Sequence, residues 1–111
     1  MCIRLYLQFQ RRVKVELNEG AKAALYALGI PNYMHESIIG YYEEGWTPGD
    51  FLSAVINNDL KEAVGRADGT NINCLKNYVM WFYNNAPSGT WGYTGAVKDY
   101  LTKFHKEIEN A

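Results

Sequence analysis

The stretch that decides the fold is WTPGDFLSAVI, residues 46–56, in which a turn signal runs directly into an apolar segment. Pro48 suits the first position of a helix because its missing N–H has no partner there, and Thr47 before it is a suitable N-cap. Apolar residues then recur at helical spacing as far as Val64. Asn57-Asn58-Asp59 interrupts the run, which therefore forms either one helix or two short helices.

Two further helices are predicted before this stretch. A short helix over 21–28 is stopped by Gly29 and Pro31. Asn32 is expected to cap the next helix, in which apolar and aromatic residues recur at helical spacing until Gly45. Gly45 is expected to end that helix because glycine is common just past a helix C-terminus.

Two more helices are predicted after it. The first opens at residues 69–71 and ends at 84–87, and we expect its buried stripe to be Ile72, Leu75, Val79 and Phe82. The glycine-rich loop 88–93 follows, and loops of this kind often carry function. Thr94 is expected to cap the last helix, whose apolar positions are Val97, Leu101, Phe104 and Ile108.

The N-terminal segment has a different pattern. From Ile3 to Leu17 apolar residues fall mostly on odd positions and polar residues mostly on even ones, which is the period of a β-strand. Arg11-Arg12 in its middle allows a bent strand or a hairpin. With no second clear strand in the chain, it would pair within itself, lie on the helices, or pair with another copy.

Length and composition favour one packed domain. The chain has 111 residues, 48% of them hydrophobic and 14% aromatic, which is typical of a globule with one core. We therefore predict a single domain over 1–111, with a basic strand segment at 1–17 and a helical body at 21–108. The predicted fold class is mainly α: a compact bundle of four to six short helices with an N-terminal β-strand or hairpin.

Charge is unevenly distributed along the chain. The net charge is −1, yet residues 1–15 carry four basic side chains and no acid, and residues 16–68 carry nine acids against three bases. Such asymmetry favours self-association or the steering of a charged ligand. It disfavours duplex DNA as a partner, because the chain as a whole lacks a basic excess.

The sequence predicts a cytoplasmic protein, and the family resemblance described below implies a bacterial host. Cys2 and Cys74 are expected to be free thiols, since one lies at a terminus and the other inside an apolar helical run. The first ten residues lack the apolar stretch and cleavage site of a signal peptide. No segment approaches the roughly 20 apolar residues that a membrane-spanning helix needs.

Catalytic and metal motifs are not recognisable. His35 and His105 are far apart, and neither has the second ligand of a His-x-x-x-His or Cys-x-x-Cys spacing. We interpret His35 as a helix-start or surface residue and expect no metal and no cofactor. Cys74 fits a small core residue better than a nucleophile.

A charged group and an aromatic group remain as candidate binding residues. Asp59, Glu62 and Arg66 are spaced to share one helix face, where Arg66 either holds an anionic ligand or forms a surface ion-pair ladder. Helix starts near Pro48 and Thr94 offer free N–H groups, with Trp46, Trp91 and Tyr93 close in sequence. These features suit a small nucleotide. They also fit ordinary capping and aromatic core packing, which is the more common case.

Several short motifs also occur together and in order: Met34-His35-Glu36, PGDFLSAV at 48–55, Asn58-Asp59-Leu60, Arg66-Ala67-Asp68, YNNAP at 83–87 and Trp91-Gly92. They resemble a widespread family of small uncharacterised phage and prophage proteins, over residues 31 to about 104. The resemblance implies a phage origin and an accessory role, and it supplies no catalytic residues. Tyr93-Thr94-Gly95 departs from the Ser-Pro-Glu that follows Trp-Gly in that family, and the basic segment 3–17 has no fixed counterpart there.

Three hypotheses follow. The first is a non-enzymatic anti-defence binder that sequesters a nucleotide immune signal or occupies a host defence protein, by class-level analogy. The second is a metal-dependent hydrolase or nuclease-like enzyme that uses Asp59, Asp68 and His35. The third is a structural adaptor that forms a homodimer or higher oligomer through its N-terminal strand. For the first hypothesis the predicted ligand-binding residues are Trp46, Asn58, Asp59, Arg66, Asp68, Trp91 and Tyr93.

Overall fold

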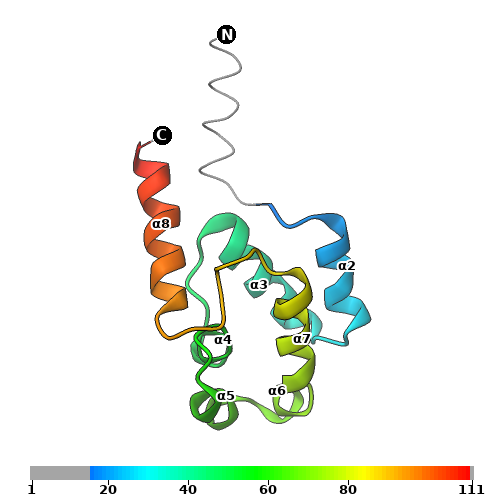
Figure 1. Ribbon diagram of the computed structural model, residues 1–111. Coiled ribbons are helices and arrows are strands. Elements are labelled where there is room, and N and C mark those ends of the chain that lie inside the picture. The colour runs from blue at the N-terminus through cyan, green and yellow to red at the C-terminus, as the bar shows by residue number, and fades with distance from the viewer. Residues whose placement is uncertain (1–15, 111) are drawn as a thin grey trace.

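The protein is mainly helical, as predicted. The computed structural model describes residues 16–110, and those residues contain seven helices and no strand (Figure 1). The strand predicted for 3–17 falls almost entirely outside the described residues, and Glu16 and Leu17 are not in a strand. The helices are α2 Glu19–Ala27, α3 Asn32–Glu44, α4 Asp50–Ile56, α5 Leu60–Arg66, α6 Gly69–Asn73, α7 Leu75–Asn85 and α8 Ala96–Asn110.

The helices are arranged around α3. Figure 1 shows α3 in the middle of the molecule, with α2 and α7 on one side, α8 on the other and α5 at the lower end. The start of the described chain is tied to the last turn of α3, because the backbone N–H of Leu17 donates to Glu43 Oε2 at 3.0 Å. Lys22 on α2 pairs with the same carboxylate at 3.2 Å. Within residues 16–110, no helix has the length and apolar character needed to span a bilayer.

Two of the predicted helix caps are displaced. α3 begins at Asn32 itself, with Pro31 in the cap position, so Asn32 is not the cap. α4 begins at Asp50 after Gly49, and Thr47 and Pro48 lie in the preceding turn. Gly49 takes the cap position because its carbonyl accepts the backbone N–H of Ser53, which is the first hydrogen bond of the helix. The Ser53 hydroxyl also donates to the Pro48 carbonyl. The predicted end at Gly45 is confirmed: it adopts a left-handed conformation with φ 71°.

The interruption at residues 57–59 divides the run into two helices. Asn58 takes a left-handed backbone conformation with φ 59°, which asparagine tolerates better than most residues. The next N–H, of Asp59, donates back to the Ala54 carbonyl at 2.8 Å and closes the end of α4. The Asp59 side chain then accepts from the backbone N–H of Glu62 at 3.3 Å and caps α5. α4 and α5 therefore form a tight pair of short helices.

The segment 69–85 is also two helices, and its predicted buried stripe is wrong in two of four positions. Ile72 and Val79 are 38% and 41% exposed, whereas Phe82 is buried and Leu75 is partly buried. The buried side chains include Tyr78 and Trp81. These larger rings bury more surface than valine or isoleucine, and their polar atoms have partners: the Tyr78 hydroxyl donates to Asn71 at 2.5 Å and Trp81 Nε1 to the Ala21 carbonyl at 2.8 Å.

The last helix is not capped by Thr94. α8 begins at Ala96, and the free N–H of Val97 donates to the side chain of Asn57 at 2.9 Å. The backbone N–H of Gly92 donates to the Ile56 carbonyl at 2.7 Å. The end of α4 thus holds both the loop before α8 and its first turn. Of the predicted apolar positions on α8, Phe104 is buried, Val97 and Leu101 are partly buried, and the side chain of Ile108 lies outside the described part.

Candidate functional site

The charged residues predicted for a site fall into two separate places. Arg66 pairs with Glu62 at 3.4 Å and with Asp50 at 3.6 Å, and Asp59 lies at the same hollow of about 190 Å³. Arg66 and Asp50 have side chains 56% and 82% exposed, so these ion pairs contribute at most about 1 kcal/mol. They form the ion-pair ladder that was one of the two predicted alternatives, at the rim of an open hollow.

Asp68 belongs to a different cluster. It caps α6 by accepting the backbone N–H of Asn71 at 2.7 Å, and its other carboxylate oxygen accepts the Tyr33 hydroxyl, also at 2.7 Å. The hydrogen bond from Tyr33, followed by the one from Asn71, lowers the pKa of Asp68. One carboxylate oxygen of Asp68 therefore caps α6, and the other links the start of α6 to α3.

His35 lies in the first turn of α3, which was one of its two predicted positions, and it is buried rather than on the surface. It is 6% exposed, its Nε2 lies 2.7 Å from the Ile30 carbonyl, and its ring packs edge-on against Tyr26 with centroids 4.4 Å apart. Among the described residues, no three histidine, cysteine or acidic side chains are grouped so that they could hold a metal ion. The predicted set of His35, Asp59 and Asp68 is thus not brought together.

The three predicted aromatic residues have different surroundings. Trp46 is 48% exposed and packs its ring against the backbone of Gly40, where an added Cβ would lie 2.0 Å from Trp46 Cε3. Trp91 is partly buried and lies 5.6 Å from the Phe82 ring between centroids. Tyr93 is 39% exposed and its hydroxyl donates to Asp99 at 3.1 Å. Tyr93 also lines a hollow.

That hollow, which we call the α8 hollow, lies between the glycine-rich loop and the first half of α8 and has a volume of about 430 Å³. Ligand pockets for small molecules commonly occupy roughly 300–1,000 Å³. Most of its lining side chains carry a polar group, although more of the lined surface is apolar than polar, and all of them come from two segments. The lining residues are Ser88, Gly89, Thr90, Tyr93, Lys98, Asp99, Tyr100, Thr102 and Lys103.

Hydrogen bonds to α3 fix the inner wall of the α8 hollow. The Thr90 hydroxyl donates to the Pro87 carbonyl at 2.6 Å and lies 3.0 Å from the Tyr42 hydroxyl. The buried Tyr100 donates its hydroxyl to the Tyr42 carbonyl at 2.5 Å. Because Tyr42 is fully buried in the core, these hydrogen bonds anchor the loop and α8 to a rigid part of the molecule.

The outer wall of the α8 hollow is positively charged. Lys98 and Lys103 are exposed, and neither forms an ion pair with the side chains described for residues 16–107. Asp99 is the one acid in the lining. Partial burial and the hydrogen bond with Asp99 raise the pKa of Tyr93, which keeps its phenol neutral and leaves its ring as an uncharged face. Two free ammonium groups beside one aromatic face can hold a phosphate-bearing ring compound.

The sequence interpretation missed both lysines. On a helix, exposed lysines usually mean a solvated face, and nothing in their spacing distinguishes them from that case. The available signal was local: Lys98 and Thr102 are four residues apart and therefore share a helix face, directly after a glycine-rich loop.

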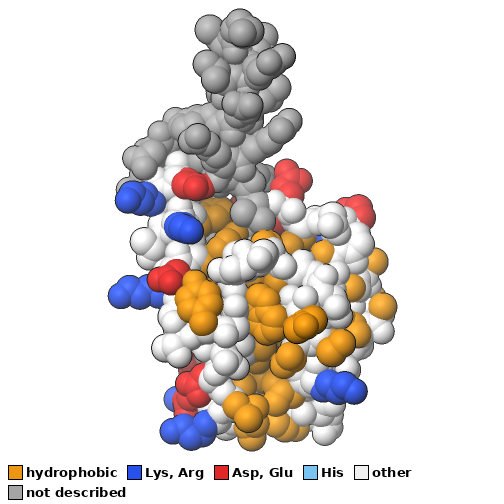
Figure 2. Space-filling view, viewed as in Figure 1, with side chains coloured by type: hydrophobic (Ala, Val, Ile, Leu, Met, Phe, Trp, Pro, Cys, Tyr) orange, Lys and Arg blue, Asp and Glu red, His pale blue; other side chains and the backbone are white. Residues whose placement is uncertain are grey.

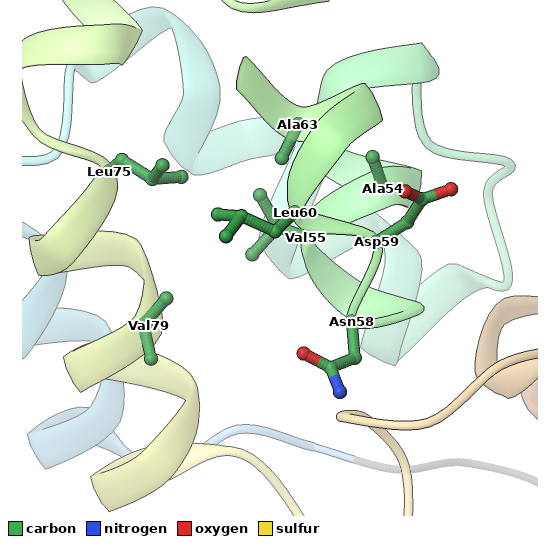
Figure 3. A pocket seen from close by; sticks show the side chains of 8 residues that line it. All are labelled: Ala54, Val55, Asn58, Asp59, Leu60, Ala63, Leu75 and Val79. Atoms are coloured by element: carbon green, nitrogen blue, oxygen red, sulfur yellow. The ribbon is translucent and has the colours of Figure 1, made fainter. Parts of the chain in front are cut away.

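A second, smaller feature is an apolar groove between α5 and α7, which we call the α5–α7 groove. Figure 3 shows Leu60 pointing across it toward Leu75 and Val79, while the Asp59 carboxylate turns to the other side. Asn58, one of the predicted site residues, lies at one end of it. Leu60 is 70% exposed, an unusual position for leucine at a place where two helices face one another.

No protein-family model matches this chain, and comparisons with curated proteins and with solved structures find no match.

Proposed function

We propose that this chain is a non-enzymatic phage accessory protein that binds and sequesters a small nucleotide in the α8 hollow. The observation that carries the proposal is the presence of two lysines, neither of them in an ion pair with a described side chain, and an exposed tyrosine ring around one hollow of about 430 Å³. The phage origin comes from the motif resemblance, and the anti-defence role from the analogy with small phage proteins that remove a nucleotide signal.

The chemistry of the lining favours a nucleotide over other anions. Lys98 and Lys103 supply charge for a phosphate group, and ammonium groups bind phosphate as point charges without strict geometry. The Tyr93 ring supplies a face for a base, and stacking of a base on an aromatic side chain is worth about 1–3 kcal/mol. Ser88 and Thr102 add hydroxyls that can bond to ribose or phosphate oxygens.

Sequestration is favoured over turnover by the roles of the acidic side chains. Asp59 and Asp68 are both engaged as helix caps, and Asp99 accepts the Tyr93 hydroxyl. A general base must lie within hydrogen-bond reach of the proton that it removes. Asp99 is the one carboxylate that lines the hollow, and it already accepts the Tyr93 hydroxyl. A bound nucleotide is therefore expected to leave the protein chemically unchanged.

Isothermal titration calorimetry with a panel of linear and cyclic nucleotides and ADP-ribose derivatives tests this proposal. The Lys98→Ala/Lys103→Ala variant should bind at least about tenfold more weakly, which corresponds to about 1.4 kcal/mol. Lys61→Ala/Lys76→Ala is the matched control, because it removes the same charge from exposed sites on α5 and α7 that do not line the hollow.

The ligand released by heat denaturation should be identical in mass to the ligand added. A nucleotide product of different mass would replace sequestration with catalysis. Absence of binding across the whole panel would refute nucleotide sequestration and leave occupation of a host defence protein as the form of the function to test.

A further inference from the structure

The α5–α7 groove is an apolar surface that the proposed nucleotide site does not use. Leu60 and Val64 lie one turn apart on α5 and are 70% and 48% exposed, and Val79 on the facing helix is 41% exposed. Residues four apart on a helix share one face, so these side chains form one continuous surface with Leu75. Figure 2 shows hydrophobic side chains gathered in a band over the middle and lower part of this side of the molecule.

The size of the groove selects a polypeptide over a small molecule. Its volume is about 60 Å³, far below the roughly 300 Å³ at which small-molecule pockets begin. A volume of this size suits the end of one aliphatic side chain better than a whole small molecule. The exposed Leu60, Val64 and Val79 beside the groove would then contact the neighbouring side chains of the bound polypeptide.

The charged residues on the flank of the groove, next to Asp59, favour a basic binding partner. Asp59 lines both the groove and the adjoining open hollow, where the other charged residues are Asp50, Glu62 and Arg66. Three carboxylates against one guanidinium leave this flank negative. An apolar segment that carries arginine or lysine is therefore complementary to the groove and its flank together.

The chain itself contains such a segment at its N-terminus. Residues 1–15 include Ile3, Leu5, Leu7 and Phe9 together with four basic side chains and no acid. We propose that the α5–α7 groove binds residues 1–15 of a second copy of this chain.

We assign the occupant to a second copy because the uneven charge of the chain favours self-association: residues 1–15 are basic, and residues 16–68 carry nine acids against three bases. The segment leads into Leu17, whose backbone N–H donates to Glu43 on the last turn of α3, and Figure 1 shows α5 at the lower end of the molecule. Exchange of the segment between two copies fills both grooves and closes a symmetric dimer.

Sedimentation velocity on the full chain tests the assembly. The unaltered chain should be a dimer, and Leu60→Asp should sediment as a monomer because it places a charge in the groove. Tyr83→Asp is the matched control, since Tyr83 lies on α7, one of the two helices that form the groove, but is 76% exposed and does not line the groove. A monomeric unaltered chain, or a Leu60→Asp variant that remains dimeric, would overturn the proposal.

The charge complementarity has its own test. Glu62→Lys on the flank should weaken the dimer at least several-fold, and the equivalent change Glu36→Lys on the exposed side of α3 should leave it unaltered. The dimer should also weaken as salt rises, because the Debye length falls from about 8 Å at 0.15 M to about 3 Å at 1 M. Equal effects of the two charge reversals would contradict the assignment of the occupant.

The native Cys2 provides a direct probe of the docking site. A full chain carrying Cys2→Ser and Val64→Cys is mixed with the unaltered chain and oxidised, so that any disulfide between positions 2 and 64 must join two copies. Peptide mass mapping should find this disulfide, and should not find it when Tyr83→Cys replaces Val64→Cys. Cys74 is buried and should not compete.

One chain carrying both Cys2 and Val64→Cys separates the remaining outcomes. If the disulfide forms only within that single chain, the occupant is the chain's own segment and the second-copy assignment is wrong. If no disulfide forms in either experiment, residues 1–15 do not occupy the groove. Neither result affects nucleotide binding in the α8 hollow, which lies on other residues.

Discussion

The side chain of Asn57, the C-cap residue of α4, accepts a hydrogen bond at 2.9 Å from the backbone N–H of Val97, which lies in the first turn of α8, 40 residues later. A helix start normally takes its cap from the residue just before it. Here the cap is supplied by the end of another helix, and the same helix end accepts the N–H of Gly92 in the intervening loop. The α8 hollow is therefore shaped by a contact between distant parts of the chain.

Replacing Asn57 by alanine should destabilise the protein by about 0.5–2 kcal/mol, the usual cost of a lost helix cap. Asn57→Asp should restore the stability, because a carboxylate accepts the same bond and suits the positive end of a helix. Urea unfolding of the three proteins measures the difference. We also expect Asn57→Ala to weaken nucleotide binding although Asn57 does not line the α8 hollow. Alanine and aspartate variants of equal stability would show that the contact has no capping role.

Gly40→Ala should have opposite effects in two backgrounds. In the unaltered chain the new Cβ would lie 2.0 Å from the Trp46 ring, so Trp46 must move and the protein should lose about 1–3 kcal/mol. In a Trp46→Ala background the obstruction is gone, and alanine should stabilise the interior of α3 by up to about 1 kcal/mol. A double-mutant cycle in urea measures both effects. The same cost in both backgrounds would mean that Trp46 does not determine the need for glycine.

Tyr41→Phe should leave the stability unchanged or raise it, whereas Tyr100→Phe should lower it. The Tyr41 hydroxyl is buried and has no hydrogen-bond partner among the described residues, so its removal loses no bond and relieves a desolvated polar group. The Tyr100 hydroxyl bonds to the Tyr42 carbonyl, and its loss should cost about 1–3 kcal/mol because that acceptor is left buried. Thermal denaturation monitored by circular dichroism compares the two. A larger loss of stability for Tyr41→Phe than for Tyr100→Phe would contradict these roles of the two hydroxyls.

Asp68 should make the stability dependent on acid pH. Its folded-state pKa is lowered, first by the hydrogen bond from Tyr33, so its charged form stabilises the fold above the unfolded-state pKa of about 3.9 and this contribution is lost as the pH falls through the folded-state pKa. Asp68→Asn does not titrate, and its single side-chain oxygen can accept only one of the two bonds that Asp68 accepts from Asn71 and Tyr33. The difference in melting temperature between the two proteins should therefore shrink below about pH 4. A difference that stays constant from pH 7 to pH 2.5 would exclude this role.

Much of the helical architecture could be predicted because the signals that set it are local. The ends at Gly45 and at 84–87 were placed correctly, since each depends on the conformational preference of one or two adjacent residues. The division at residues 57–59 was recognised but not resolved. Its outcome depends on Asn58 adopting a left-handed conformation, which asparagine permits but does not require.

The candidate site was predicted less well, because its residues are brought together by packing. Of the seven predicted binding residues only Tyr93 lines the α8 hollow, and Lys98 and Lys103 were missed. Asp59 and Asp68 were recognised as chemically capable, yet both are used as helix caps. A carboxylate at a helix start suits a cap and a binding group equally, and sequence does not separate these uses.

The sequence by itself determined that this protein is helical, where several of its helices end, and that its basic charge is concentrated in the first fifteen residues. These properties follow from backbone preferences and composition, which act within a few residues. Only the tertiary structure decided that Tyr78 and Trp81 are buried while Val79 is exposed, and that Asn57 caps α8. Those outcomes depend on which of several amphipathic faces buries the most surface once all helices compete for one core.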